Sequence, residues 1–177
     1  MRPLSSLLAV AALALCACQS AQTVDPEALY NDALVAEVPN LGQPFPSVLT
    51  SGQLSREQFA DLVAAGVTTF INLRGPDEPN TGWEAEYAQE LGVTFVRLPV
   101  SGKADINWQK AGELDALLAQ AADGPVMVSC GSSNRVGALF ALRAVSVSGL
   151  TPGEAMTLGK SAGLKSLEPV VAEQLLK

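Results

Sequence analysis

The residues from 48 to 147 alternate between short apolar segments and longer segments with helical spacing. Strand-like runs are predicted over residues 48–50, 67–73, 93–100 and 126–128. Glycines and prolines separate these runs from the helical segments between them. Because strands that alternate with helices form a mostly parallel sheet with helices on both faces, the sequence predicts an α/β fold with a mostly parallel central sheet flanked by helices.

Several helices are predicted from spacing and from signals at their ends. Ser55 with Gln58 and Thr151 with Glu154 each fit a capping box, in which a hydroxyl and the side chain three residues later bond each other's backbone. The predicted helices cover residues 55–66, 83–91, 106–122, 136–147, 151–162 and 167–176.

The segment from 126 to 137 joins a predicted buried strand to a helix through a loop of small residues. Cys130 follows the strand, Arg135 opens the helix, and the loop between them consists of Gly131, Ser132, Ser133 and Asn134. Small residues let backbone N–H groups turn inward around an anion, and the helix N-terminus adds partial positive charge. The guanidinium of Arg135 matches a tetrahedral oxyanion, and a thiol in such a field becomes a thiolate nucleophile. The alternative is a buried structural Cys130 beside a surface Arg135.

The Cys–x4–Arg spacing on a strand-to-helix loop resembles the cysteine-phosphatase and rhodanese superfamilies. The sequence VSCGSSNRVGAL, together with TSGQLSREQF and TFINLRGPDE upstream, resembles the bacterial phosphatase-like family found beside or fused to beta-lactamase-like hydrolases. That family is related to dual-specificity phosphatases, and the resemblance covers about residues 48–145. It implies a dual-specificity phosphatase-like fold and a cysteine-dependent phosphatase-like hydrolase. In that chemistry Cys130 attacks phosphorus, Arg135 and the loop amides hold the oxyanion, and an aspartate protonates the leaving oxygen.

The loop departs from the usual phosphatase pattern at several positions. Four residues rather than five separate Cys130 from Arg135, and the chain contains no histidine, so Ser129 stands where relatives commonly have one. Val136 replaces a serine or threonine that assists hydrolysis of the intermediate, and Ser133 replaces a glycine. Activation of Cys130 therefore depends on the loop amides, the helix end and Arg135.

The general acid that the resemblance implies is assigned to Asp105. Direct alignment places Gly102 at the acid's position, and Asp105 is the nearest carboxylate. Asp105 also fits the N-cap of a helix starting at Ile106. Asp77 is a second candidate for the acid, and it also fits a turn.

Other polar and aromatic residues admit two interpretations each. Arg74 extends the positive field of the site or is a surface residue at a strand end. Trp83 and Trp108 form walls of a cleft or pack at the core and its rim. The hydroxyls of Ser132 and Ser133 donate to an anion, or these residues serve only by being small. Asn72 is expected to bond across loops in a structural role.

Two alternatives to phosphate hydrolysis remain open. Rhodanese-like sulfurtransferases also place four residues between cysteine and arginine, form a cysteine persulfide, and need no carboxylate acid. A non-catalytic anion-binding domain would keep the loop and Arg135 without turnover. Phosphate hydrolysis and both of its alternatives predict a phosphate- or sulfur-containing anionic ligand. No cofactor motif or metal cluster is present in the sequence, and a net charge of −7 disfavours nucleic acid as a partner.

The N-terminal residues resemble a bacterial lipoprotein signal. Residues 1–17 contain Arg2 and an apolar run too short to cross a membrane, and Cys18 is the expected lipidation site because Leu15 directly precedes Cys16. Gln19 after Cys18 suggests sorting to the outer membrane in that pattern. We therefore expect an exported, periplasmic protein with a lipid anchor in the membrane, and an ordinary cleaved secretory signal is the alternative. Cys130 would then be the only thiol, which excludes an intramolecular disulfide.

The remaining chain is divided into a tether and one domain. Residues 18–46 are polar and interrupted by prolines, which predicts a tether with a short helix over 26–35, or alternatively a strap packed on the domain. Residues 47–177 form the predicted phosphatase-like domain, long enough for a single hydrophobic core.

Overall fold

The computed structural model describes residues 24–121 and 124–176. The predicted signal over 1–17 and the predicted lipidation site Cys18 lie outside the described residues. Within the described ranges no helix combines the length and the apolar character needed to cross a membrane. The same ranges contain no group of three histidine, cysteine or acidic side chains placed to hold a metal ion.

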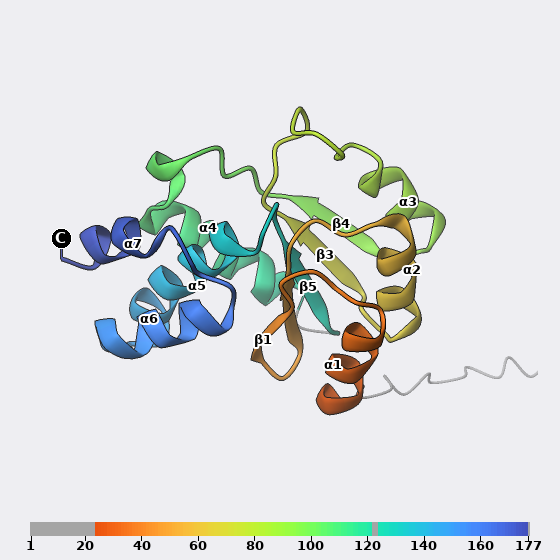
Figure 1. The fold of residues 1–177 in the computed structure, drawn as a ribbon, viewed down its shortest axis with the longest axis horizontal. Coiled ribbons are helices and arrows are strands. Elements are labelled where there is room, and N and C mark those ends of the chain that lie inside the picture. The colour runs from red at the N-terminus through yellow and green to blue at the C-terminus, as the bar shows by residue number, and fades with distance from the viewer. Residues whose placement is uncertain (1–23, 122–123, 177) are drawn as a thin grey trace, which may run out of the picture.

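A five-stranded sheet forms the centre of the fold (Figure 1). The strands are β1 Gly42–Phe45, β2 Val48–Ser51, β3 Thr69–Asn72, β4 Thr94–Arg97 and β5 Val126–Ser129. Their order is β1-β2-β5-β3-β4, and β5 runs parallel to both β2 and β3. β3 and β4 are also parallel, whereas β1 pairs antiparallel with β2. The predicted α/β fold with a mostly parallel central sheet is therefore confirmed.

Helices cover both faces of this sheet. The helices are α1 Pro26–Val35, α2 Arg56–Ala64, α3 Glu84–Glu90, α4 Trp108–Gln120, α5 Asn134–Ser146, α6 Pro152–Ser161 and α7 Glu168–Leu175. α1, α2 and α3 lie on one side of the sheet and α4 to α7 on the other (Figure 1). Both predicted capping boxes, at the starts of α2 and α6, are present.

The sheet is buried on both faces, which explains the continuous apolar runs of its strands. Along β5, Val126 and Val128 pack with the cluster under α4 to α7, whereas Met127 packs with the cluster under α1 to α3. Because side chains alternate along a strand, one short segment supplies both cores.

The segment predicted as a tether is part of the folded unit from residue 24 onward. α1 begins after Asp25, whose carboxylate accepts from the Glu27 N–H, and it buries Leu29 and Ala33 against the sheet. β1 follows at the sheet edge. The tether prediction is wrong for residues 24–46, and the alternative of a strap packed on the domain describes them. β1 escaped prediction because it contains Pro44, which an edge strand tolerates.

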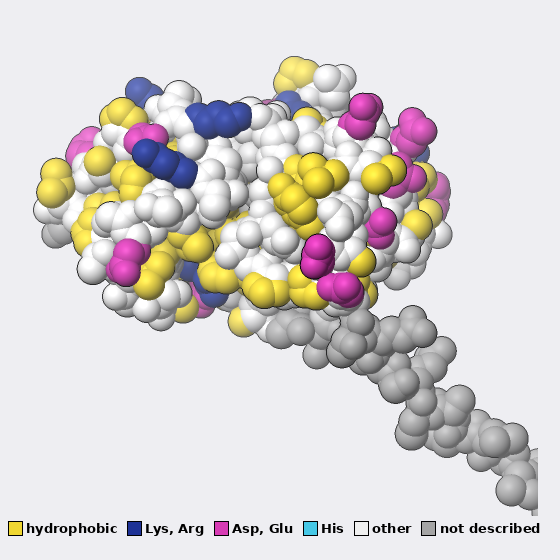
Figure 2. All heavy atoms as spheres, turned by 60° about the horizontal axis from the view of Figure 1, so that its bottom comes forward, with side chains coloured by type: hydrophobic (Ala, Val, Ile, Leu, Met, Phe, Trp, Pro, Cys, Tyr) yellow, Lys and Arg dark blue, Asp and Glu magenta, His cyan; other side chains and the backbone are white. Residues whose placement is uncertain are grey.

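Charge is distributed unevenly between the two layers of helices. The first 93 residues contain eleven acidic and three basic side chains, whereas residues 94–177 contain seven acidic and eight basic ones. Figure 2 shows acidic side chains gathered over the half of the molecule that holds α1, α2 and α3. Any anion site therefore depends on basic groups close to it rather than on the field of the whole molecule.

Candidate active site

Cys130 lies at the carboxyl end of the central strand β5. Its N–H donates to the Ser51 carbonyl at 3.2 Å, so the residue still pairs with the neighbouring strand β2. Only 1% of its surface is exposed, and it is the free cysteine of the described residues. The loops that follow β2, β3 and β4 reach this same edge of the sheet, as parallel topology requires. The thiol therefore lies where these loops meet.

The loop after Cys130 turns its backbone toward solvent. Gly131 and Ser132 are exposed, and the Gly131 carbonyl accepts from the Gln53 N–H at 3.3 Å. Among the described residues, the N–H groups of Gly131 and Ser132 donate to no protein acceptor. The first N–H groups of α5 are also unpaired, as at any helix N-terminus. Free donors of this kind could bind an anion, and the anion-binding role of the loop stays a prediction.

The hydroxyl of Ser133 has a structural role. Its backbone is left-handed, with φ 63°, at the N-cap of α5. Its Oγ donates to the Ala162 carbonyl at 2.9 Å and the side chain is fully buried. The prediction that the Ser133 hydroxyl donates to an anion is therefore wrong. The left-handed backbone also explains why related loops favour glycine at this position.

Asn134 holds the loop to the connection between α6 and α7. Its Nδ2 donates to Ser166 Oγ at 2.7 Å, and its Oδ1 accepts from the N–H groups of Lys165 at 2.8 Å and Leu167 at 3.3 Å. Both polar atoms of its side chain take part in these contacts, so the side chain has a structural role.

Arg135 folds back from α5 over the loop. Its Nη2 lies 3.5 Å from the Cβ that any larger residue at Gly131 would carry. Nη1 donates to the Val100 carbonyl at 2.7 Å. Nη1 and Nη2 donate together to the two carboxylate oxygens of Glu78, each at 2.8 Å. The loop after β5 is thereby tied to the loops after β3 and β4.

Glu78 is the carboxylate of this site that the sequence interpretation missed. Besides both nitrogens of Arg135, it accepts from Arg74 Nε at 2.9 Å and from the Gly75 N–H at 2.8 Å. The hydrogen bonds from Arg135 lower the pKa of Glu78 to about 2, against the opposing effect of burial and with help from Arg74 and Gly75. The Glu78 hydrogen bond in turn raises the pKa of Arg135, with burial opposing and the nearby Cys130 contributing. Glu78 and Arg135 are therefore both charged at neutral pH.

The guanidinium of Arg135 keeps one edge for a ligand. An arginine carries five N–H donors. Val100 and Glu78 take both donors of Nη1 and one of Nη2. The two remaining donors, on Nε and Nη2, form the other edge of the guanidinium, and Nη2 lies close to Gly131. Glu78 therefore fixes the orientation of Arg135 and leaves a second fork of donors toward the loop.

Arg74 is buried, with 8% of its surface exposed, so its interpretation as a surface residue is wrong. Its Nη1 donates to Gln53 Oε1 at 2.7 Å while its Nε holds Glu78. Asn72 Oδ1 accepts from the Arg74 N–H at 2.9 Å, and Asn72 Nδ2 donates to Glu84 at 3.1 Å. The predicted structural role of Asn72 is confirmed. These contacts fix the start of the loop that presents Glu78.

A cavity of about 660 Å³ opens over the arginine. It is lined by residues 75–79 and by Pro99, Ser101 and Arg135. Cys130 is not among the lining residues, and it is buried. Neither Trp83 nor Trp108 lines the cavity. Trp83 packs against Phe59 and Tyr87, whereas Trp108 lies at the start of α4.

The two candidate acids differ in their relation to this cavity. Asp77 is exposed and lines it. Asp105 ends the short 3-10 turn Lys103–Asp105, and its Oδ2 accepts from the Ser101 N–H at 2.6 Å. The interpretation of Asp105 as an N-cap is wrong, because Asn107 caps α4 by accepting from the Lys110 N–H at 2.9 Å. The role of Asp105 as general acid stays a prediction, and the geometry favours Asp77.

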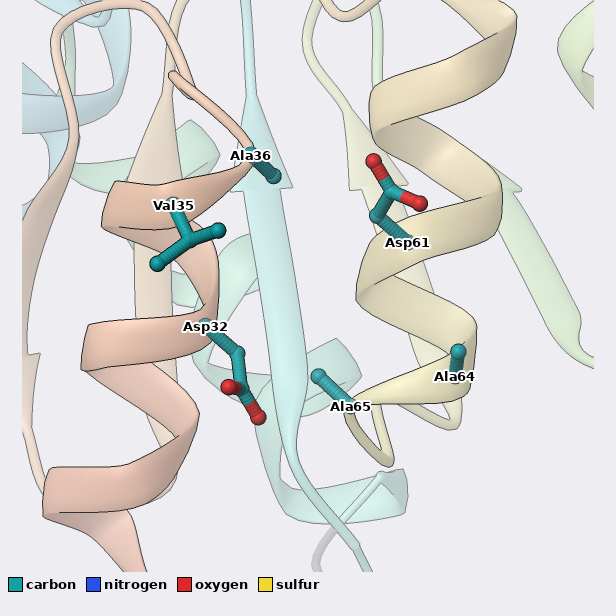
Figure 3. A pocket seen from close by; sticks show the side chains of 6 residues that line it. All are labelled: Asp32, Val35, Ala36, Asp61, Ala64 and Ala65. Atoms are coloured by element: carbon teal, nitrogen blue, oxygen red, sulfur yellow. The ribbon is translucent and has the colours of Figure 1, made fainter.

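A second cavity, of about 350 Å³, lies between α1 and α2 (Figure 3). Its side chains are Asp32, Val35, Ala36, Asp61, Ala64 and Ala65. It contains carboxylates and small apolar groups but no nucleophile and no cation. This cavity therefore belongs to no part of the candidate site.

Comparison with known proteins places the fold among phosphatases. No protein-family model and no curated protein matches the chain. Solved structures do match. A candidate phosphatase from Neisseria meningitidis Z2491 superposes with a TM-score of 0.65 at 22% identity, over 76% of this chain and 96% of that one. A candidate phosphatase (DUF442) from Shewanella putrefaciens CN-32 gives 0.60 at 23% identity, over 78% and 87% of the chains.

A structure of P. aeruginosa TpbA in complex with pTyr is also similar, with a TM-score of 0.57 at 19% identity over 87% of this chain and 86% of that one. Human DUSP28 gives 0.52 at 23% identity over 78% and 91% of the chains. The chain therefore has the predicted dual-specificity phosphatase-like fold.

Proposed function

We propose that this chain is a cysteine-dependent phosphatase-like hydrolase that acts through the loop from Cys130 to Arg135. The observation that carries the proposal is the free edge of the Arg135 guanidinium, which remains after Glu78 and Val100 fix the side chain beside the loop at Gly131. Free backbone donors, an oriented arginine and a buried thiol at one place match the needs of attack on a tetrahedral anion. The similarity of fold to phosphatases supports the same function.

In the proposed reaction the Cys130 thiolate attacks phosphorus and the bond from phosphorus to the leaving oxygen breaks. Arg135 and the N–H groups of the loop from Gly131 onward hold the nonbridging oxygens as charge moves onto them. A carboxylic acid protonates the leaving oxygen. Water then attacks the cysteinyl phosphate, which releases inorganic phosphate and restores the thiolate.

We assign the acid to Asp77 in preference to Asp105. Asp77 shares the cavity with Arg135, whereas the Asp105 carboxylate faces the N–H of Ser101 within its own turn. Ser101 and Arg135 border the same cavity, so a leaving group there would lie within reach of Asp77. Glu78 is excluded as the acid, because its pKa of about 2 keeps it ionised.

Access to the thiol requires a local movement of the residues that cover it. The cavity reaches the guanidinium but not Cys130, which is 1% exposed. An arriving phosphate would bind the free edge of Arg135 first and then the loop amides beneath it. The closed arrangement also shields the thiol from oxidants, a benefit to a lone cysteine in an oxidising compartment.

The test compares two chemistries on one protein. We would assay the purified chain on an aryl phosphate and on thiosulfate plus cyanide, with Cys130→Ser and Arg135→Ala as variants. We expect phosphate release that Cys130→Ser abolishes and Arg135→Ala lowers by at least about a hundredfold. Thiocyanate formation without phosphate release would move the chain to sulfur transfer. If neither reaction occurs but phosphate binds and Arg135→Ala weakens the binding, the loop is a non-catalytic anion receptor.

We also propose that the protein is exported and lipid-anchored through Cys18, in the periplasm at the outer membrane. The support is the short apolar run and the Leu15-Cys16-Ala17-Cys18 sequence before the folded unit. Labelling of expressing cells with a radioactive fatty acid should mark the wild type and a Cys16→Ala variant but not a Cys18→Ala variant. Labelling that survives in Cys18→Ala would refute the anchor.

A further inference from the structure

Most basic side chains of the described residues already have an acidic partner. Six of them form salt bridges with a carboxylate: Arg74, Arg97, Lys110, Arg135, Arg143 and Lys160. Arg56 instead lies over the rings of Trp83 and Tyr87, at 5.1 and 5.0 Å. Within residues 24–121 and 124–176, this leaves Lys103 and Lys165 as the cations without a carboxylate or ring partner.

Lys165 lies next to the loop of the candidate site. Its N–H donates to Asn134 Oδ1 at 2.8 Å, and its Nζ donates to Asn40 Oδ1. A Cβ built on Gly52 would lie 3.2 Å from Asn40 Nδ2 and 3.2 Å from the Gly131 carbonyl oxygen. The ammonium group is therefore separated from the loop backbone by one asparagine side chain.

The sheet order places Lys165 and Glu78 on opposite sides of the thiol. Gly52 follows β2, which lies on one side of β5, and Glu78 follows β3, which lies on the other. The β3 side carries Asp77 and Glu78 at the rim of the cavity. A second negative charge on a bound anion would be repelled there. The β2 side instead offers an ammonium whose hydrogen-bond acceptor among the described residues is a neutral amide.

We infer that Lys165 determines specificity by binding a second anionic group of the substrate, so the substrate is a phosphate monoester that carries another phosphate or a carboxylate. This inference rests on the proposed function of the loop. Lysine suits such a role because its ammonium is a compact charge on a flexible stem and can leave Asn40 to meet a ligand. The protein as a whole has a net charge of −7, so discrimination between anions must come from cations at the site itself.

The test measures a preference rather than an activity. We would determine kcat/KM of the full chain for a sugar bisphosphate and for the matching monophosphate, in the wild type, Lys165→Gln and Lys160→Gln. Lys160→Gln removes the same charge one turn away, from a lysine that already pairs with Glu168 at 3.0 Å. We expect Lys165→Gln to lower the bisphosphate preference about threefold to fivefold, the range of an exposed ion pair, with the monophosphate changed less than about twofold.

Three results would overturn the inference. The first is an unchanged bisphosphate preference in Lys165→Gln, and the second is an equal loss of that preference in Lys160→Gln. The third is a loss of the preference in Lys103→Gln alone, because the cation would then lie on the other rim of the cavity. If neither the sugar phosphates nor the aryl phosphate is hydrolysed, the proposed function fails and binding decides. Calorimetry with inorganic phosphate and pyrophosphate should then show tighter pyrophosphate binding that Lys165→Gln removes, and equal affinities for the two anions would refute the role of Lys165.

Discussion

Replacing Glu78 by glutamine tests the central electrostatic contact of the site. The contacts with Arg135 and Arg74 hold the pKa of Glu78 at about 2, against a usual value of 4.5. Since each pKa unit corresponds to about 1.4 kcal/mol, the full effect would be about 3 kcal/mol. Because 30% of the Glu78 side chain is exposed, solvent screening reduces the effect. We expect Glu78→Gln to lower the free energy of unfolding by about 1–2 kcal/mol at pH 7.

The pH dependence of this loss has a definite sign. The folded state lowers the pKa of Glu78, so its contribution to stability is complete above the unfolded value of about 4.5. The contribution disappears as the pH falls from there toward 2, because the unfolded carboxylate binds a proton in that range and the folded one does so only near pH 2. The gap between wild type and Glu78→Gln should therefore be wide at pH 7 and narrower at pH 3.

Urea unfolding of both proteins at pH 7 and pH 3 measures this gap, with Glu113→Gln as the matched control. The hydrogen bond from Lys110 also lowers the pKa of Glu113, but that residue is at the surface, with 36% of its side chain exposed. Its replacement should cost less than about 0.5 kcal/mol. A gap for Glu78→Gln that is equal at both pH values, or no larger than that of Glu113→Gln, would refute the reasoning.

The structure makes three further predictions. Gly137→Ala places a Cβ 2.1 Å from the Leu164 N and 2.5 Å from the Gly159 carbonyl oxygen. The substitution should lower the free energy of unfolding by about 3 kcal/mol and Tm by at least about 6 °C. A fall under 2 °C in a thermal scan would contradict the tight contact of α5 with α6. Asn72→Ala leaves the buried Glu84 and the Arg74 N–H short of a partner and should lower the free energy of unfolding in urea by about 2 kcal/mol, whereas no change would show that water replaces the amide. Asp77→Asn should lower kcat about a hundredfold on an alkyl phosphate and little on an activated aryl phosphate. Asp105→Asn should keep kcat within about threefold. The reverse pattern would assign the general acid to Asp105.

Much of the fold could be predicted because its signals are local. The capping boxes at Ser55 and Thr151 mark helix starts through side chains three residues apart, and both are present. The parallel strands are buried on both faces, so their apolar runs stand out against the polar segments around them. The strand β1 lacks such a run. It lies at the edge, contains Pro44, and gains its place only by pairing with β2 across a tight turn.

The site was predictable in part for a similar reason. Cys130 and Arg135 belong to one loop, and the order of strand, small residues and helix fixes where they lie. Glu78 and Arg74 belong to a different loop, and their contact with Arg135 depends on how residues 73–82 turn back toward β5. The spacing of four residues between Arg74 and Glu78 was the available signal. It is weak in a segment broken by Pro76 and Pro79, since such pairs have meaning mainly on a helix.

The charges of the site bear on what anion it can hold. Arg74 and Arg135 together carry two positive charges and Glu78 carries one negative charge, so the thiolate that the proposed reaction requires at Cys130 would make the centre neutral before a ligand binds. A phosphate dianion then adds uncompensated negative charge. Its affinity must come from the free edge of Arg135, the loop N–H groups and the N-terminus of α5. A second anionic group on the ligand needs a further cation. Of the two lysines in the described residues that lack a carboxylate partner, Lys165 is held beside the loop by its backbone N–H, which donates to Asn134 Oδ1.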